Sequence, residues 1–227
     1  MAAGTLIRSL IAVSTAMPNA AVPSPAAERA IALIKDEHRA IARILGAMQA
    51  WISRTRESAS HRNVELFDAM LRYIENVPDR LHHPKEDSVL FPALARRASA
   101  AETLIRRLEW DHAHGGALLY ALHGSFHALI YGTANGLNQL ATAVDEFAEF
   151  YWDHMRREEV QLLPLAIAHL TADDWQSVAS AFGDNTDPLF GGELAADYRR
   201  LYECIAEWTP APLKSYLEEA APRAGSQ

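Results

Sequence analysis

The chain has 227 residues, of which 49% are hydrophobic and 22% are charged, and its formal net charge is −8 at pH 7. These values are typical of a globular domain, and the acidic charge argues against nucleic acid or an anionic membrane as partner, since either would require a basic surface. Cys204 is the single cysteine, so an internal disulfide and a cysteine-rich metal site are excluded.

Residues 1–25 contain the only candidate targeting segment. Arg8 precedes a short, weakly apolar stretch over residues 9–17, and small residues follow, which faintly resembles a signal peptide. The stretch is interrupted by hydroxyl side chains, so we expect a disordered leader and a cytoplasmic protein, with export as the alternative. No run approaches the roughly 20 apolar residues of a membrane span.

Apolar residues recur every three or four positions from Ala26 onward, which predicts a first amphipathic helix. Ser24 and Pro25 precede it and are typical of an N-cap and of a first helical position. The apolar stripe consists of Ile31, Ile34, Ile41, Leu45, Met48 and Ile52. His38 occupies a missing position of this stripe and is therefore expected to face the interior.

A second helix is expected from about residue 64 to residue 97, and a third begins near residue 99. Pro84 lies within the second helix, where it removes a backbone hydrogen bond and should kink the helix. The segment from Ser99 to Glu102 matches a capping box and predicts the start of the third helix. The apolar stripe of that helix also has a gap, which His112 fills.

A glycine-containing loop over residues 132–136 precedes a fourth long helix. Two shorter helices are expected after it, one from a Thr171 cap to about residue 182 and one over about residues 192–208. Long amphipathic helices joined by short loops specify an all-α fold, an antiparallel up-down four-helix bundle. The predicted parts are a leader (1–25), the bundle (26–169), a C-terminal helical extension (170–209) and a loosely ordered tail (210–227).

The chain contains one pattern twice: a lone histidine, then a histidine and a glutamate four positions apart, then a proline. The second copy follows the first by 72 to 74 positions. The spacing of four places the histidine and the glutamate of each pair on one helix face. The candidate metal ligands of the two copies are His38, His82, Glu86, His112, His154 and Glu158.

The four helices should bring these six side chains to one level of the bundle. In an antiparallel hairpin, two residues lie level when they are equidistant from the turn. His38 and His82 average to position 60, within a polar break, and His112 and His154 average to position 133, within the glycine-containing loop. At about 1.5 Å per residue each ligand lies about 30 Å from its loop, so the site is expected deep within the bundle.

The chemistry of the six side chains favours a pair of metal ions. Two facing carboxylates are strongly disfavoured in an apolar interior unless cations neutralise them. Four imidazoles give each of two ions two nitrogen ligands, with Glu86 and Glu158 as bridges and with positions left open for an external ligand. Nitrogen and oxygen ligands suit iron or manganese and suit zinc less well. The alternative is a set of buried histidine–glutamate hydrogen bonds without a metal.

These motifs resemble the hemerythrin-like family, whose HHE domain binds cations. The resemblance covers about residues 28–168 and depends on the segments 36–38, 82–92, 110–112 and 154–164. It implies a four-helix bundle around a non-haem centre of two iron ions, with a small ligand such as O2, NO or peroxide.

The chain departs from the oxygen-carrying hemerythrins at two of their ligand positions. Those proteins carry a histidine four residues after the third-helix histidine, where this chain has Gly116. They carry an aspartate five residues after the fourth-helix histidine, whereas Glu158 follows His154 by four. These differences argue against simple reversible oxygen carriage. Gly116 and Ala42 are expected to leave room beside each metal, which suits a reactive or exchangeable site.

The two histidine–glutamate pairs also resemble the di-iron domain of bacterial iron–sulfur cluster repair proteins that respond to nitric oxide. Those proteins carry an additional cysteine-containing N-terminal domain that has no counterpart in this sequence. We therefore predict a protein that binds or senses O2, NO or iron. The alternatives are an enzyme that reduces peroxide, O2 or NO or that oxidises iron, and a stress-related repair factor. The helices over about 171–208 could also dock a partner or form a homodimer.

Side chains that flank the six ligands could support them. His83 is a candidate extra ligand, a hydrogen-bond donor behind a ligand, or a surface group. Tyr151 either donates a hydrogen bond to a bound ligand or packs in the core. Four acidic neighbours either orient the imidazole N–H groups or lie at the surface, namely Glu37, Asp87, Asp111 and Glu159.

Overall fold

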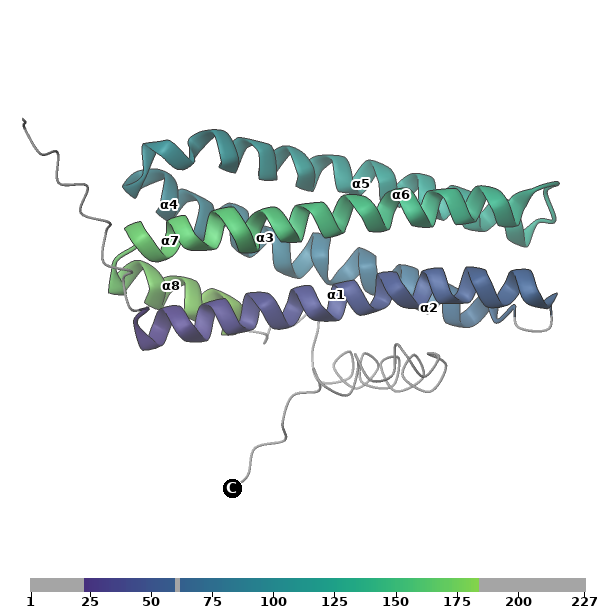
Figure 1. The fold of residues 1–227 in the computed structure, drawn as a ribbon, viewed down its shortest axis with the longest axis horizontal. Helices are drawn as coiled ribbons and strands as arrows, with labels where there is room; N and C mark the ends of the chain where they lie inside the picture. The colour runs from purple at the N-terminus through teal and green to yellow at the C-terminus, as the bar shows by residue number, and fades with distance from the viewer. Residues whose placement is uncertain (1–22, 60–61, 184–227) are drawn as a thin grey trace, which may run out of the picture.

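The computed structural model describes residues 23–59 and 62–183, and every regular element in these ranges is helical. Four long helical rods lie side by side and form an elongated antiparallel bundle (Figure 1). The predicted all-α bundle is therefore confirmed. The expected leader, the helix over 192–208 and the tail lie outside the described residues. None of the described helices combines the length and the apolarity that a membrane span requires.

The first rod is helix α1 (Pro25–Glu57), which begins where the sequence predicts. The Ser24 side chain accepts a hydrogen bond from the backbone N–H of Ala27 at 3.2 Å, as an N-cap does. Its buried face contains the predicted apolar residues from Ile34 to Ile52, and His38 lies within the same face. Only Ile31 of the predicted stripe is partly exposed.

The second rod is helical from Val64 to Arg97, but it is not a continuous α-helix. It consists of α2 (Val64–Asn76), η2 (Pro78–His82), α3 (His83–Lys85), η3 (Glu86–Leu90) and α4 (Phe91–Arg97). The segments η2 and η3 are π-helical turns, in which an N–H bonds the carbonyl five residues back. The kink expected at Pro84 thus takes the form of widened turns.

Each π-helical turn begins six residues before a proline. The fourth rod repeats this arrangement in α6 (Gly136–Arg157), η5 (Glu158–Leu162) and α7 (Leu163–His169), with Pro164 after the π turn. A proline offers no N–H and its ring clashes with the carbonyl four residues back. An i→i−5 bond, such as that from Leu163 N–H to the Glu158 carbonyl, keeps the helix closed around that clash.

The third rod is α5 (Glu102–Ile130), and it does not start with the expected capping box. The side chain of Ser99 makes no cap hydrogen bond. The chain instead turns at Ala98, which is extended, into the 3₁₀ turn η4 (Ser99–Ala101), closed by a 3.0 Å bond from Ala101 N–H to the Ala98 carbonyl. The capping-box prediction was wrong because helical geometry begins at Ser99 itself, which places its side chain after the cap position.

Two apolar clusters fill the bundle, one toward each end. One cluster includes Phe67, Phe126 and Phe147 and lies toward the end where α5 turns into α6. The other includes Phe91 and Leu163 and lies toward the opposite end. In the first three rods the buried charged side chains lie between the two clusters in sequence; on the fourth rod Glu158 does so, and His154 lies beside Met155 at the edge of the first cluster. The fold therefore provides a polar layer that is closed at both ends by apolar side chains.

Helix α8 (Ala172–Gly183) folds back beside α1 (Figure 1) and also contacts α3 and η3. Its apolar stripe belongs to the second core cluster and consists of Trp175, Val178, Ala179 and Phe182. The Phe182 ring lies 5.8 Å from the His82 ring, centroid to centroid. The first of the two expected C-terminal helices thus buries its stripe within this chain and covers one side of the polar layer.

Candidate metal centre

All four rods contribute to a single cluster of buried donor side chains. The side chains of the six predicted ligands are between 0% and 7% exposed. α1 supplies one, the second rod two, α5 one and the fourth rod two, and they are His38, His82, Glu86, His112, His154 and Glu158. The structure brings all six together at the level that the loop positions predict.

One half of the cluster, which we name subsite A, contains His38, His82 and one oxygen of each glutamate. The Nε2 atoms of the two histidines lie 3.1 Å apart. His38 Nε2 lies 3.1 Å from Oε2 of Glu158, and His82 Nε2 lies 3.4 Å from Oε1 of Glu86. The potential ligand atoms of these four residues all lie within 4.8 Å of one another.

The other half, subsite B, contains His112, His154 and the remaining oxygen of each glutamate. His112 Nε2 lies 3.4 Å from Oε2 of Glu86, and His154 Nε2 lies 3.3 Å from Oε1 of Glu158. Each glutamate therefore offers one oxygen to each subsite. Two glutamates placed in this way would each contact both ions of a bound metal pair.

Polar atoms in this cluster lack hydrogen-bond partners within the described residues. They are both carboxylate oxygens of Glu86, both of Glu158, Nε2 of His112 and both ring nitrogens of His154. Buried carboxylate oxygens without donors are costly, and facing carboxylates repel each other. Atoms bound to one ion at about 2.1 Å lie up to about 4.2 Å apart, which matches the spacing of these donors. The donor set therefore fits a pair of metal ions.

Each of the four ligand histidines faces an acidic side chain on its outer ring nitrogen, Nδ1. A carboxylate can only accept, so a hydrogen bond to it places the ring proton on Nδ1 and turns the Nε2 lone pair inward. The Nδ1-to-oxygen distances are 2.9 Å for His38–Glu159, 2.6 Å for His82–Glu37, 2.9 Å for His112–Asp87 and 3.6 Å for His154–Asp111.

These contacts run around the bundle in one direction. Glu37, next to the α1 ligand, holds the histidine of the second rod, and Asp87 of the second rod holds that of α5. Asp111 of α5 faces the histidine of the fourth rod, and Glu159 of the fourth rod holds that of α1. Because each acid adjoins a ligand in sequence, we name this set the carboxylate ring.

The pKa values show that the cluster favours positive charge. Burial alone would lower the pKa of His82, but the charge of Glu86 and the hydrogen bond to Glu37 raise it to about 10. Burial opposes a similar rise at His112, where Asp87, Glu158 and Glu86 raise the pKa to about 11. A metal ion competes with these protons for the same Nε2 lone pairs and satisfies the same negative potential.

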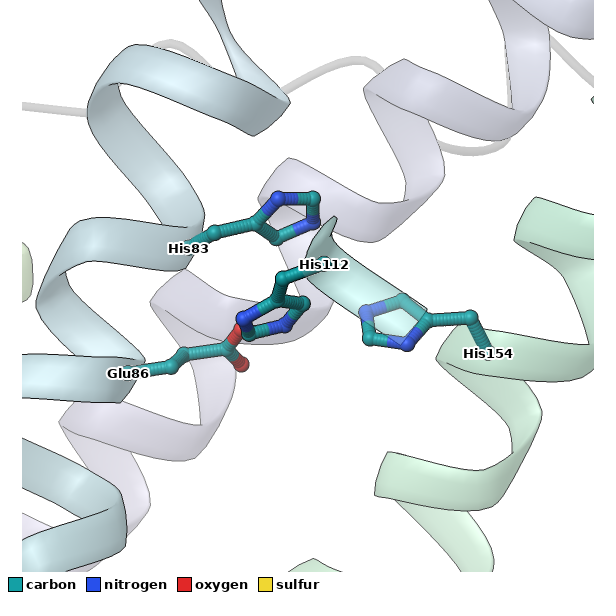
Figure 2. A group of neighbouring side chains, drawn as sticks. All are labelled: His83, Glu86, His112 and His154. Atoms are coloured by element: carbon teal, nitrogen blue, oxygen red, sulfur yellow. The ribbon is translucent and has the colours of Figure 1, made fainter. Parts of the chain in front are cut away.

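His83 lies against subsite B, where its ring stacks on His112 with centroids 4.0 Å apart and 12° between the planes (Figure 2). Its ligand atom falls within the group that includes Glu86, His112 and His154. A nitrogen lone pair lies in the ring plane, so two nearly parallel rings at this separation cannot both point at one ion. Burial lowers the pKa of His83 to about 4, which leaves the ring neutral.

Tyr151 is buried and its hydroxyl donates a 3.1 Å hydrogen bond to Oδ1 of Asp79, rather than pointing at the two subsites. Asp79 also lies 3.5 Å from Nδ1 of His83, and the sequence offered only its spacing, one helical turn before His83, as a signal for it. A Cβ added at Gly115 would lie 3.1 Å from the Tyr151 hydroxyl, so a residue without a side chain suits this position.

The expectation that Gly116 leaves room beside a metal was wrong. Gly116 is exposed, and a Cβ added there would meet nothing within 4 Å. Gly115 is the buried glycine of this pair, because the inward face of α5 passes through Asp111, Gly115 and Leu119. Ala42, the corresponding small residue of α1, is partly buried against the core.

The comparisons with known proteins agree with this geometry. The family model described as the hemerythrin HHE cation binding domain matches residues 29–166 of the chain. Neither the curated proteins nor the solved structures gave a significant match. The matched range contains all six predicted ligands and the whole carboxylate ring, and it covers more than half of the chain. The chain therefore belongs to the hemerythrin HHE cation-binding domain family.

Proposed function

We propose that the chain holds two iron ions, one in each subsite, and binds a small molecule such as O2, NO or peroxide at an open position between or beside them. The observation that carries this proposal is the division of each glutamate between the subsites, with one oxygen of Glu86 and one of Glu158 at each. Two imidazole nitrogens and two carboxylate oxygens fill four positions of an octahedral ion and leave two for an external ligand.

The residues around the cluster support binding rather than conversion of an organic substrate. The carboxylate ring orients the imidazoles, and the two apolar clusters close the polar layer at both ends. Bound iron would supply reversible coordination of a diatomic ligand and one-electron chemistry. The rings of His83 and of the buried Phe91 flank that of His112 in subsite B. We therefore favour a binding or sensing protein.

Metal analysis of the anaerobically purified chain, with optical spectra before and after exposure to O2 and NO, tests this proposal. We expect two irons per chain and a stable spectral change on exposure to one of these ligands. If the analysis instead finds two manganese or two zinc ions per chain, that metal takes the place of iron in the proposal. Consumption of added peroxide with rapid loss of the ferrous form would identify an enzyme instead.

The variant Glu158→Ala should retain at most one iron per chain, because it removes an oxygen from both subsites at once. Glu109→Ala is the matched control, since Glu109 is an exposed residue of α5. Metal content is measured after both proteins are shown to have the same helical circular dichroism. Full retention of two ions by Glu158→Ala would contradict the proposed bridging role.

A further inference from the structure

In the carboxylate ring, three of the four contacts between an acid and a histidine are hydrogen bonds, and the fourth is not. Oδ2 of Asp111 lies 3.6 Å from Nδ1 of His154, which is too long for a hydrogen bond. That nitrogen is buried and has no hydrogen-bond partner. The three hydrogen bonds span 2.6 to 2.9 Å. The outer nitrogen of His154 is thus the one in the ring that no carboxylate holds.

Two arginines hydrogen-bond the carboxylate of Asp111, which is the acid of the carboxylate ring that faces His154. Arg157 Nη1 lies 2.5 Å from Oδ2 of Asp111, the same oxygen that faces His154. Arg107 Nε lies 2.9 Å from Oδ1. The Asp111 side chain is 0% exposed, and it is met by the partly buried Arg157 side chain and by Arg107, whose side chain is 52% exposed. Asp111 is therefore hydrogen-bonded to two arginines, and it faces the His154 imidazole at 3.6 Å without a hydrogen bond.

The two subsites consequently differ in how their histidines are supported. Both histidines of subsite A are bonded to carboxylates, whereas only His112 is so bonded in subsite B. A carboxylate on Nδ1 raises the basicity of a ligand histidine, and losing such a contact typically weakens metal binding by about 10- to 100-fold.

Access to the two subsites differs as well. A cleft of about 290 Å³ opens between α5 and α6, and Arg107, Asp111 and Arg157 line it. Glu146, Glu149 and Asp153 complete its acidic rim. On the side of subsite A, α8 covers the bundle and the buried Phe182 ring lies against His82. The cleft thus reaches the buried Asp111 behind subsite B, whereas the acids behind subsite A, Glu37 and Glu159, lie at the surface with side chains 20% and 34% exposed.

We propose that subsite B is the exchangeable metal position, because Arg157 and Arg107 hold Asp111 away from His154, while subsite A retains its ion. This inference rests on the proposed function, since it requires two ions per chain. It assigns unequal roles to two halves that the repeated sequence pattern presents as equivalent. The ion of subsite A is a permanent part of the fold, and that of subsite B binds last and leaves first.

Anaerobic titration of the metal-free full chain with ferrous iron, in competition with a chelator of known affinity, tests the inference. We expect two binding steps whose affinities differ at least about tenfold. In Arg157→Met, Oδ2 of Asp111 is free to accept from His154, so the weaker step should tighten by about tenfold while the tighter step stays unchanged. Arg156→Met is the control, because Arg156 is an exposed neighbour with the same charge.

Arg107→Met provides a second variant in case Arg157→Met does not fold. It frees the other oxygen of Asp111, so it should tighten the weaker step by a smaller factor. Two equal affinities in the unmodified chain would overturn the inference, and so would an Arg157→Met variant that alters only the tighter step or neither. Failure of the unmodified chain to bind two ions would instead refute the proposed function on which the inference depends.

Discussion

At the scale of single residues, three of the four ligand imidazoles, those of His38, His82 and His112, are hydrogen-bonded to an acid through Nδ1 while Nε2 faces the cluster. His82 shows this arrangement most clearly, since Glu37 bonds its Nδ1 at 2.6 Å while its Nε2 faces Glu86. With both Nδ1 atoms protonated, the Nε2 atoms of His38 and His82 would be two acceptors 3.1 Å apart, which requires a cation between them. The acids of the carboxylate ring thus decide where cations bind without touching them.

Glu37→Gln should weaken iron binding at subsite A by about 10- to 100-fold, because glutamine removes the charge that makes His82 a strong ligand. The amide retains the size of the side chain, so the fold should persist. Asp36→Asn is the matched control, since Asp36 is exposed and pairs with Arg39 on the same helix. Competition with a chelator measures the iron affinity of subsite A in Glu37→Gln and in Asp36→Asn. The same affinity in the two variants would show that Glu37 does not support the metal.

At the scale of elements, the π-helical turns explain how the second rod presents several donors to the interior. η2 and η3 flank the short helix α3, and His82, His83 and Glu86 are all buried across this segment. Each widened turn shifts the face of the following residues by about one position. The fourth rod has a single such turn, which begins at Glu158, and it presents only two donors. The second π turn of the second rod thus accompanies one additional buried donor, His83.

The N-terminus of α8 is held by hydrogen bonds to the carboxylate of Asp174, and these depend on pH. Thr171 Oγ1 and N–H donate to Oδ2 of Asp174 at 2.7 and 3.0 Å, and Arg97 Nε donates to the same oxygen at 3.0 Å. Hydrogen bonds from Thr171, together with Arg97, hold the pKa of Asp174 below its usual value of 3.8 despite partial burial. The carboxylate therefore stabilises the folded chain above that value, and the contribution is lost as the pH falls through the lowered pKa.

Asp174→Asn should lower the free energy of unfolding by about 1 kcal/mol at pH 7, the usual contribution of a helix cap. The difference from the unmodified chain should begin to shrink as the pH falls below 3.8, where the unfolded state takes up a proton, and should vanish below the lowered pKa of the folded state. Urea denaturation between pH 7 and 3 measures the free energy of unfolding of both proteins. Asp173→Asn is the control, because Asp173 is an exposed neighbour of Asp174. A difference independent of pH would show that the charge of Asp174 does not matter.

At the scale of the whole molecule, the chain forms one unit that reaches beyond the fourth rod. α8 shares the second core cluster with α1, α4 and α7, and its residues lie against the second rod beside subsite A. We therefore propose that the folding unit extends to Gly183 rather than ending at residue 169. The polar layer carries three buried carboxylates, of which Asp111 is paired with two arginines. We expect the stability of this unit to depend on cations that neutralise the other two, Glu86 and Glu158.

Removal of the metal should lower the melting temperature of the chain. Free metal at about 1,000 times its dissociation constant stabilises the folded state by about 4 kcal/mol, and each kcal/mol corresponds to about 2–4 °C for a chain of this size. Calorimetry with and without a chelator should therefore show a difference of about 10 °C. Glu158→Ala should lose most of this difference. Identical melting temperatures with and without metal would contradict a structural role for the ions.

The sequence by itself determined the helices, their turning points and the level of the ligands. These properties follow from helical periodicity and from distance along the chain, so positions 60 and 133 sufficed to align His38 with His82, and His112 with His154. The family resemblance added the expected chemistry, and the matched family confirms its cation-binding character.

Only the tertiary structure decided which acid holds which histidine, that Arg157 takes Asp111 from His154, that His83 stacks on His112, and that Gly115 rather than Gly116 faces inward. These contacts join different rods, and they depend on how far each helix is rotated about its own axis. The π-helical turns change that rotation within a rod, which a repeat of 3.6 residues does not reveal. Two identical ligand patterns therefore became two unequal halves of one site.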